Sequence, residues 1–158
     1  MHLTKNDLPE AMRAKVVELL NARLADAIDL QTQCKQAHWN VHGSMFGALH
    51  KLFDQINEEV EEYVDLIAER TVQLGGTAEG TVRSVATRTT LPDYAARSSS
   101  GRAHVDALST ALATFGKHIR AGIARCDDLG DKVTSDLLTS IARGNDKWVW
   151  MVEAHAHD

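Results

Sequence analysis

The sequence has little proline, few aromatic residues and few cysteines, and these shortages exclude several classes of protein. Aromatic residues make up 5% of the 158 residues and only two prolines occur, whereas charged residues reach 25%. β-Sandwiches and barrels rely on aromatic and β-branched residues, so this composition argues against them. Length and composition together predict a single all-α domain covering residues 1–158, with a short N-terminal tail over residues 1–8.

The two cysteines do not form a CxxC motif, and no long hydrophobic run is present. Cys34 and Cys126 each fall where a helical apolar stripe continues, which predicts two buried, reduced thiols rather than a disulfide. No apolar run approaches the roughly 20 residues that a membrane span needs, and the N-terminus lacks the apolar region of a signal peptide. We therefore expect a cytoplasmic protein with no membrane-spanning segment.

An excess of positive charge is also missing. The formal net charge is −5 and the isoelectric point is near 5.9. A surface that attracts nucleic acid through general positive potential is therefore not expected, although a local basic patch remains open.

Apolar residues recur at steps of three and four, which predicts four long helices. These helices cover approximately residues 6–38, 45–74, 101–126 and 131–152. The connection over residues 76–100 is rich in Thr, Ser, Gly and Arg and has no sustained period. A connection of this length lets the third helix run parallel to the second, so we predict a four-helix bundle with a long crossover and a short extra helix over residues 91–96.

Five residues with metal-binding side chains lie around the second helix, and they are His38, His50, Asp54, Asp65 and Glu69. Imidazole and carboxylate suit iron and neighbouring divalent metals. His50 with Asp54, and Asp65 with Glu69, are pairs spaced four residues apart, so each pair shares a helix face. The two pairs are separated by roughly 16 Å along the axis, which is too far for one ion. A second, antiparallel copy would bring them together; the alternative is an ordinary solvated helix face.

Three strings in this region resemble the signature of the Dps family, small relatives of ferritin: QCKQAHWNVHG, FGALHKLFDQI and DLIAERTVQLGG. The similarity extends over about residues 15–153. It implies a ferritin-like fold and a hollow dodecamer that oxidises Fe(II), preferably with hydrogen peroxide, and stores the ferric mineral. The implied enzyme is a ferroxidase with di-iron sites at the two-fold interface. Its implied ligands are His38, His50 and Asp54 from one subunit, with Asp65 and Glu69 from the other.

The resemblance also implies roles for residues near these ligands. Trp39 is expected either to donate electrons or simply to pack. An inward face carrying Glu58, Glu61 and Glu62 would nucleate mineral, unless these side chains only solvate the helix. Asp136, and after it Asp131, are the residues expected to line negatively charged three-fold pores. Three other histidines, His42, His104 and His118, are expected at the surface or behind the ligands.

DNA binding, which the family name suggests, is not expected here. Family members often bind DNA with a mobile Lys-rich tail, whereas this chain has only Lys5 before Pro9. Association with the nucleoid would depend on such binding. Two alternatives to the ferroxidase are a DNA-compacting protein and a structural bundle that docks a partner. A bacterioferritin-like haem enzyme is a third, but the fourth helix lacks Glu-x-x-His.

Overall fold

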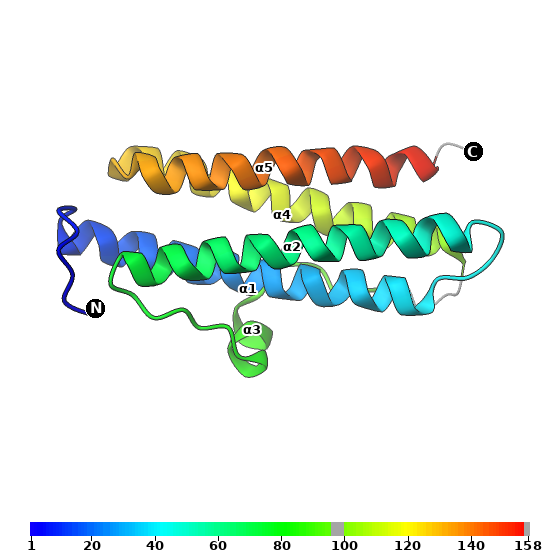
Figure 1. Ribbon diagram of the computed structural model, residues 1–158, viewed down its shortest axis with the longest axis horizontal. Helices are drawn as coiled ribbons and strands as arrows, with labels where there is room; N and C mark the ends of the chain where they lie inside the picture. The colour runs from blue at the N-terminus through cyan, green and yellow to red at the C-terminus, as the bar shows by residue number, and fades with distance from the viewer. Residues whose placement is uncertain (96–99, 157–158) are drawn as a thin grey trace.

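The computed structural model describes residues 1–95 and 100–156, and within them four long helices lie side by side (Figure 1). The elements are α1 (Glu10–Asn40), α2 (Phe46–Gln73), the short α3 (Val82–Arg88), α4 (Gly101–Leu129), α5 (Lys132–Glu153) and a final 3₁₀ turn, η1 (Ala154–Ala156). The predicted all-α class is confirmed. In Figure 1, α2 and α4 run in one direction while α1 and α5 run in the other, so the crossover makes α4 parallel to α2 as predicted.

Several helix boundaries follow from local capping. Gly75 has φ +84° just beyond α2, and Gly130 has φ +81° just beyond α4, a left-handed conformation that glycine adopts without strain. Helix α4 continues three residues past the predicted end, so Asp127 and Asp128 belong to its last turn and not to the connecting loop. Asp131 begins α5 by accepting a hydrogen bond from the Thr134 N–H at 3.0 Å.

The first helix begins later than predicted. The sequence suggested a start near Asn6, but α1 begins at Glu10 with Pro9 as its N-cap residue. The Asn6 side chain instead accepts a hydrogen bond from the Leu8 N–H at 3.0 Å, forming a turn. A residue that precedes proline is disfavoured in helical conformation, so the helix cannot extend back through Leu8.

The short helix of the crossover was predicted in the wrong place. It lies at Val82–Arg88, where the Thr81 hydroxyl caps it by accepting from the Ser84 N–H. Residues 91–95 are not helical, and residue 96 lies outside the described residues. Pro92 disfavours a helix that includes the residue before it, whereas Thr81 supplies a cap that the prediction overlooked.

Polar side chains on α1 hold the crossover against the bundle. Asp26 is fully buried, and its Oδ1 accepts hydrogen bonds from the Thr90 backbone N–H at 2.8 Å and the Thr90 hydroxyl at 3.0 Å. Arg23 forms an ion pair with Asp26 at 2.9 Å. Asn21 bonds to both the Thr77 carbonyl and the Glu79 N–H. These contacts fix the path that carries the chain back to the start of α4.

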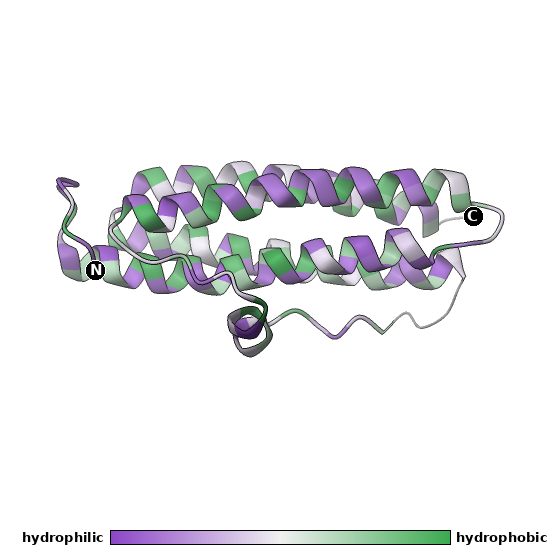
Figure 2. Cartoon of the chain, turned by 60° about the horizontal axis from the view of Figure 1, so that its bottom comes forward, coloured by the Kyte–Doolittle hydropathy of each residue, from purple (hydrophilic) through white to green (hydrophobic). Residues whose placement is uncertain are grey.

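One continuous apolar core lies between the four long helices, and it includes both cysteines. Burial raises the pKa of Cys34 to about 12 and that of Cys126 to about 11, so both remain protonated thiols near neutral pH. The prediction that both cysteines are buried is confirmed. Hydrophobic and hydrophilic residues are interspersed along every long helix (Figure 2). Among the described residues, no helix is long and apolar enough to cross a membrane.

Candidate metal centre

His38 and His50 face each other where α1 ends and α2 begins. Their rings are stacked with centroids 3.7 Å apart. Nδ1 of His38 lies 2.8 Å from the His50 carbonyl oxygen, and Nδ1 of His50 lies 2.9 Å from the His38 carbonyl oxygen. A carbonyl oxygen only accepts, so both Nδ1 atoms carry the proton and donate. In the neutral rings, each Nε2 is therefore left with a free lone pair, which is the form that binds a metal.

Asp54 lies beside this histidine pair, one helical turn after His50. Its Oδ1 is 2.7 Å from Nζ of Lys35 on α1 and 3.8 Å from Nδ1 of His38. The Lys35 ammonium lowers the pKa of Asp54 most; partial desolvation opposes this, and His38 lowers it further. Asp54 is therefore an ionised carboxylate next to two imidazoles. Lys35 was not predicted as part of this group, although its spacing of three residues from His38 places both on one face of α1.

Asp65 and Glu69 lie farther along α2, and both are exposed. They share no cluster with the histidines, and among the described residues no three His, Cys, Asp or Glu side chains are grouped to hold a metal ion. Asp65 follows Asp54 by eleven residues, which is roughly 16 Å along the helix axis. One subunit thus carries two separate groups of the predicted ligands, and it brings only His38, His50 and Asp54 close to one another.

Large apolar side chains are exposed near both groups. Trp39, which follows His38, is 69% exposed, and Phe46, at the start of α2, is 46% exposed. Near Glu69, Leu66 is 42% and Val72 is 55% exposed. A shallow groove lies there, lined by Ala68, Glu69, Val72, Gln73 and Ala78. Exposed apolar residues on one side of a helix pair are typical of a surface that another chain covers.

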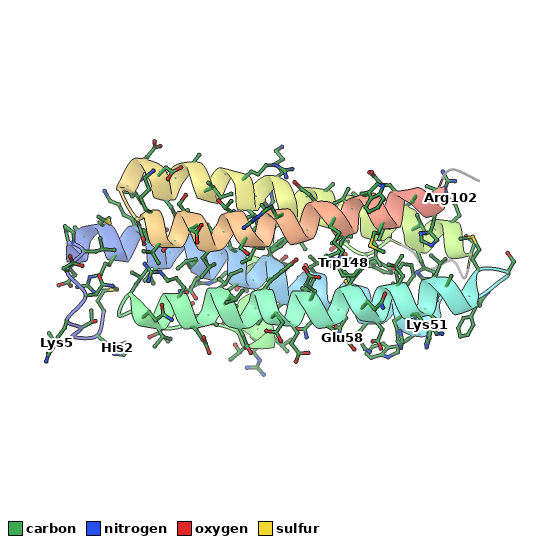
Figure 3. All side chains as sticks on the ribbon, turned by 45° about the horizontal axis from the view of Figure 1, so that its top comes forward. His2, Lys5, Lys51, Glu58, Arg102 and Trp148 are labelled. Carbon is green, nitrogen blue, oxygen red and sulfur yellow. The ribbon has the colours of Figure 1, made fainter. Side chains whose placement is uncertain are left out.

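The predicted nucleation residues divide between two places. Glu58 and Glu62, with Gln55 and Glu59, line the α2 side of an open groove, and its α5 side is lined by Lys147, Trp148 and Met151. Figure 3 shows Trp148 projecting from α5 toward α2, where Glu58 lies. Glu61 is exposed but does not line this groove. Glu59 was missed; it accepts a hydrogen bond from the Tyr63 hydroxyl at 2.6 Å, a pair whose spacing of four residues was visible in the sequence.

The two predicted pore residues lie in different environments. Asp136 is exposed on α5. Asp131 is 1% exposed and accepts from the Arg70 guanidinium at 3.1 and 3.3 Å and from the Thr134 hydroxyl at 2.5 Å. Within the chain, the Asp131 carboxylate is thus buried and already paired, which is an environment that disfavours a pore role. Asp136 remains the prediction.

The remaining histidines also differ from one another. His104 is fully buried and lies 2.6 Å from the Tyr94 hydroxyl, which excludes the first of its two predicted positions, at the surface or behind the ligands. His118 is partly exposed and pairs with Asp26 at 3.3 Å. His155 lies 2.9 Å from the Met151 carbonyl oxygen.

Comparison with known proteins places this arrangement in a family. Residues 17–158 match the model of the ferritin-like domain. The chain is 41% identical to the DNA protection during starvation protein of Agrobacterium fabrum, with 99% of this chain and 97% of that protein covered. The corresponding protein of Mycolicibacterium smegmatis is 33% identical, with 94% and 80% covered.

Solved structures agree with these relatives. The structure of Mycobacterium smegmatis Dps has a TM-score of 0.94 at 32% identity, covering all of this chain and 90% of that one. DpsC from Streptomyces coelicolor has a TM-score of 0.94 at 32% identity, with 99% and 91% covered. The fold and the sequence therefore lead to the same conclusion: this chain belongs to the Dps family of ferritin-like proteins.

Proposed function

We propose that this protein oxidises Fe(II), preferably with hydrogen peroxide, at sites shared by two subunits, and stores the ferric product inside a hollow dodecamer. The observation that carries the proposal is the reciprocal hydrogen bonding of His38 and His50. It leaves both Nε2 atoms available as donors, and the Asp54 carboxylate lies 3.8 Å from Nδ1 of His38. Two neutral imidazoles and a carboxylate form a donor set that suits Fe(II) as a substrate.

The second half of each site comes, in this proposal, from a partner subunit. Asp65 and Glu69 are exposed, lie roughly 16 Å along α2 from Asp54, and are bordered by exposed apolar side chains. A two-fold axis that packs α2 against its copy would bring the Asp65–Glu69 pair of one subunit to the histidines of the other. The same symmetry produces two identical sites in each dimer.

The residues of such a site have separable tasks. The imidazoles bind Fe(II) without adding charge, and the carboxylates stabilise the Fe(III) product through their negative charge. Oxidising two Fe(II) per peroxide consumes two protons and yields two Fe(III) and two waters. Because both electrons reach one peroxide, no hydroxyl radical is released.

A subunit-mixing experiment tests the shared site. Asp54→Ala damages the histidine half of a site and Glu69→Ala damages the other half, so each variant alone should oxidise Fe(II) slowly. When the two variants are unfolded together and reassembled, half of the dimers should be mixed, and each mixed dimer should contain one intact site. The mixture should then recover about a quarter of the wild-type rate.

Control outcomes make this experiment decisive. A double variant carrying both substitutions in the same chain should recover nothing after mixing with itself. If the single-variant mixture also recovers nothing while assembling normally, the ligands do not come from different subunits. Wild-type oxidation rates in the double variant would instead favour the alternative, a structural bundle that docks a partner.

Assembly and storage are tested separately. Native mass measurement should give twelve subunits, and Leu66→Glu should reduce both assembly and iron oxidation by placing a charge on the exposed apolar surface.

Glu58 and Glu62, in the groove between α2 and α5, are proposed to nucleate mineral. Exchanging both for Gln should slow mineral growth and leave the initial oxidation rate unchanged. Asp136→Asn should slow iron entry if this residue lines a pore.

DNA binding is proposed to be weak or absent. The His2 N–H donates to the Gly75 carbonyl at 2.6 Å, and Figure 3 shows His2 and Lys5 gathered at one end of the bundle. Arg13 is buried and donates to the Leu8 and Leu74 carbonyls, so it does not serve as a phosphate contact. A gel shift with duplex DNA at ~150 mM salt should show no submicromolar binding. Submicromolar affinity would overturn this expectation.

A further inference from the structure

A tyrosine and a histidine are joined by a short hydrogen bond at the end of the bundle that carries His38 and His50. Tyr94 belongs to the crossover, and His104 lies in the first turn of α4. The Tyr94 hydroxyl oxygen is 2.6 Å from Nδ1 of His104, and the two rings are stacked with centroids 6.0 Å apart. His104 is fully buried, and its Nε2 makes no hydrogen bond within the described part of the chain.

The environment keeps both members of the pair uncharged. Burial lowers the pKa of His104; the backbone of Asn40 partly offsets this and His42 adds to it, so the imidazole is neutral. Burial also raises the pKa of Tyr94, and Cys34 raises it further, so the phenol keeps its proton. In the tautomer of His104 that carries its proton on Nε2, Tyr94 donates its hydroxyl proton to Nδ1. In that tautomer the phenol is hydrogen-bonded to a nitrogen that can take up the proton when the phenol is oxidised, because oxidation makes the phenol strongly acidic.

The pair lies directly behind the segment that joins the two predicted histidine ligands. His42 and Ser100 form a backbone bridge just before α4 begins. A Cβ on Gly101 would lie 2.8 Å from the Leu49 side chain, so α4 packs tightly against the residue that precedes His50. Figure 3 shows Arg102 of α4 and Lys51 of α2 at the same end of the bundle.

We propose that Tyr94 and His104 act as a proton-coupled electron donor to peroxide reduction at the candidate metal centre, a role that rests on the proposed function. One Fe(II) gives one electron to hydrogen peroxide. Tyr94 gives the second electron as its O–H bond breaks and the proton forms an N–H bond on Nδ1 of His104. The peroxide O–O bond breaks, and two protons from solvent complete two waters. A second Fe(II) then reduces the Tyr94 radical, and His104 returns the proton.

The position of the Lys35 ammonium explains why the site would need an additional electron donor. It lies 2.7 Å from Asp54, so it competes with metal for one of the predicted carboxylates. A site that holds a single Fe(II) can deliver only one electron, and one-electron reduction of peroxide releases hydroxyl radical. The Tyr94–His104 pair would complete the two-electron reduction until the second Fe(II) arrives. The net reaction remains two Fe(II) oxidised per peroxide.

The chain offers a matched control for a direct test, because it has only two tyrosines. Tyr63 also donates to a base at 2.6 Å, in this case Glu59. The assembled, iron-free protein is treated with flash-generated ruthenium(III) tris-bipyridine, a one-electron oxidant, and radicals are identified by electron paramagnetic resonance. The tyrosyl signal should be lost in Tyr94→Phe and retained in Tyr63→Phe. A signal that survives Tyr94→Phe, or that arises only from tryptophan, overturns the assignment.

A second measurement connects the pair to iron. The protein is loaded anaerobically with one Fe(II) per site and mixed with one equivalent of hydrogen peroxide and a spin trap. Tyr94→Phe should release more hydroxyl-radical adduct than the wild type, whereas Tyr63→Phe should match the wild type. His104→Phe should behave like Tyr94→Phe, because the phenol then has no proton acceptor. If all four proteins release equal amounts of adduct while iron oxidation is normal, the role of the Tyr94–His104 pair is refuted and the proposed function stands. If the wild type does not oxidise iron, the proposed function is refuted. The ruthenium experiment then still tests whether Tyr94 is the oxidised residue.

Discussion

Replacing Asp131 with alanine should destabilise the protein severely, because this carboxylate has two structural tasks. It pairs with Arg70, which is 6% exposed, and it caps α5 through the Thr134 N–H. Removing one partner of a buried ion pair costs about 3–5 kcal/mol, and losing an N-cap costs about 1 kcal/mol. Since one carboxylate serves both tasks, we expect a loss of about 4 kcal/mol. For a chain of this length that corresponds to a fall in Tm of about 8–16 °C.

The assay is urea unfolding followed by circular dichroism, at matched subunit concentration because assembly adds to apparent stability. Asp136→Ala is the matched control; its side chain is exposed on the same helix, so its unfolding free energy should stay within about 0.5 kcal/mol of the wild type. A double variant, Arg70→Leu with Asp131→Asn, leaves no unpaired buried charge and keeps a capping side chain. It should be more stable than Asp131→Ala. Wild-type stability in Asp131→Ala, together with slowed iron entry, would refute the structural role and restore the pore role.

Three further predictions concern the thiols, two glycines and Lys35. Because burial raises the pKa of Cys34 from 9.0 to about 12, its alkylation by iodoacetamide at pH 8 should be about 1000-fold slower than that of a free thiol, and Cys126 should also react slowly. Rapid alkylation of the native protein would contradict the burial of these thiols. Both protonated thiols should contribute fully to stability below pH 9, and this contribution should decline as the pH rises toward their raised pKa values, which pH-dependent urea unfolding measures. Gly76→Ala should cost about 1–3 kcal/mol in unfolding free energy, since the added Cβ would lie 2.6 Å from a valine methyl of α1, whereas Gly47→Ala adds a Cβ in open space and should not destabilise. Lys35→Met should tighten anaerobic Fe(II) binding by at most about fivefold in calorimetry, because a partly exposed ion pair contributes about 0.2–1 kcal/mol; weaker binding would mean that Lys35 positions Asp54 instead.

Helix prediction succeeded where the signal was local. The period of the apolar residues and the glycines after Leu74 placed α2 within one residue at either end, because side-chain burial and left-handed turns are properties of neighbouring residues. It failed at the crossover, where Thr81 caps α3 and Asp26 holds Thr90 in an irregular path. That buried carboxylate is 64 residues away in sequence from the threonine it binds. No local pattern could indicate such a contact.

The sequence by itself determined the four long helices, the crossover, the family and the separation of the predicted ligands into two groups. All of these depend on residue spacing along one chain and on the fixed rise of a helix. Only the tertiary structure decided that Nδ1 of His38 and of His50 are both occupied by carbonyl oxygens, and that Lys35 lies against Asp54. It also placed Asp131 in a buried ion pair with Arg70. Protonation, pairing and burial depend on which side chains meet across helices, and spacing within one helix does not specify them.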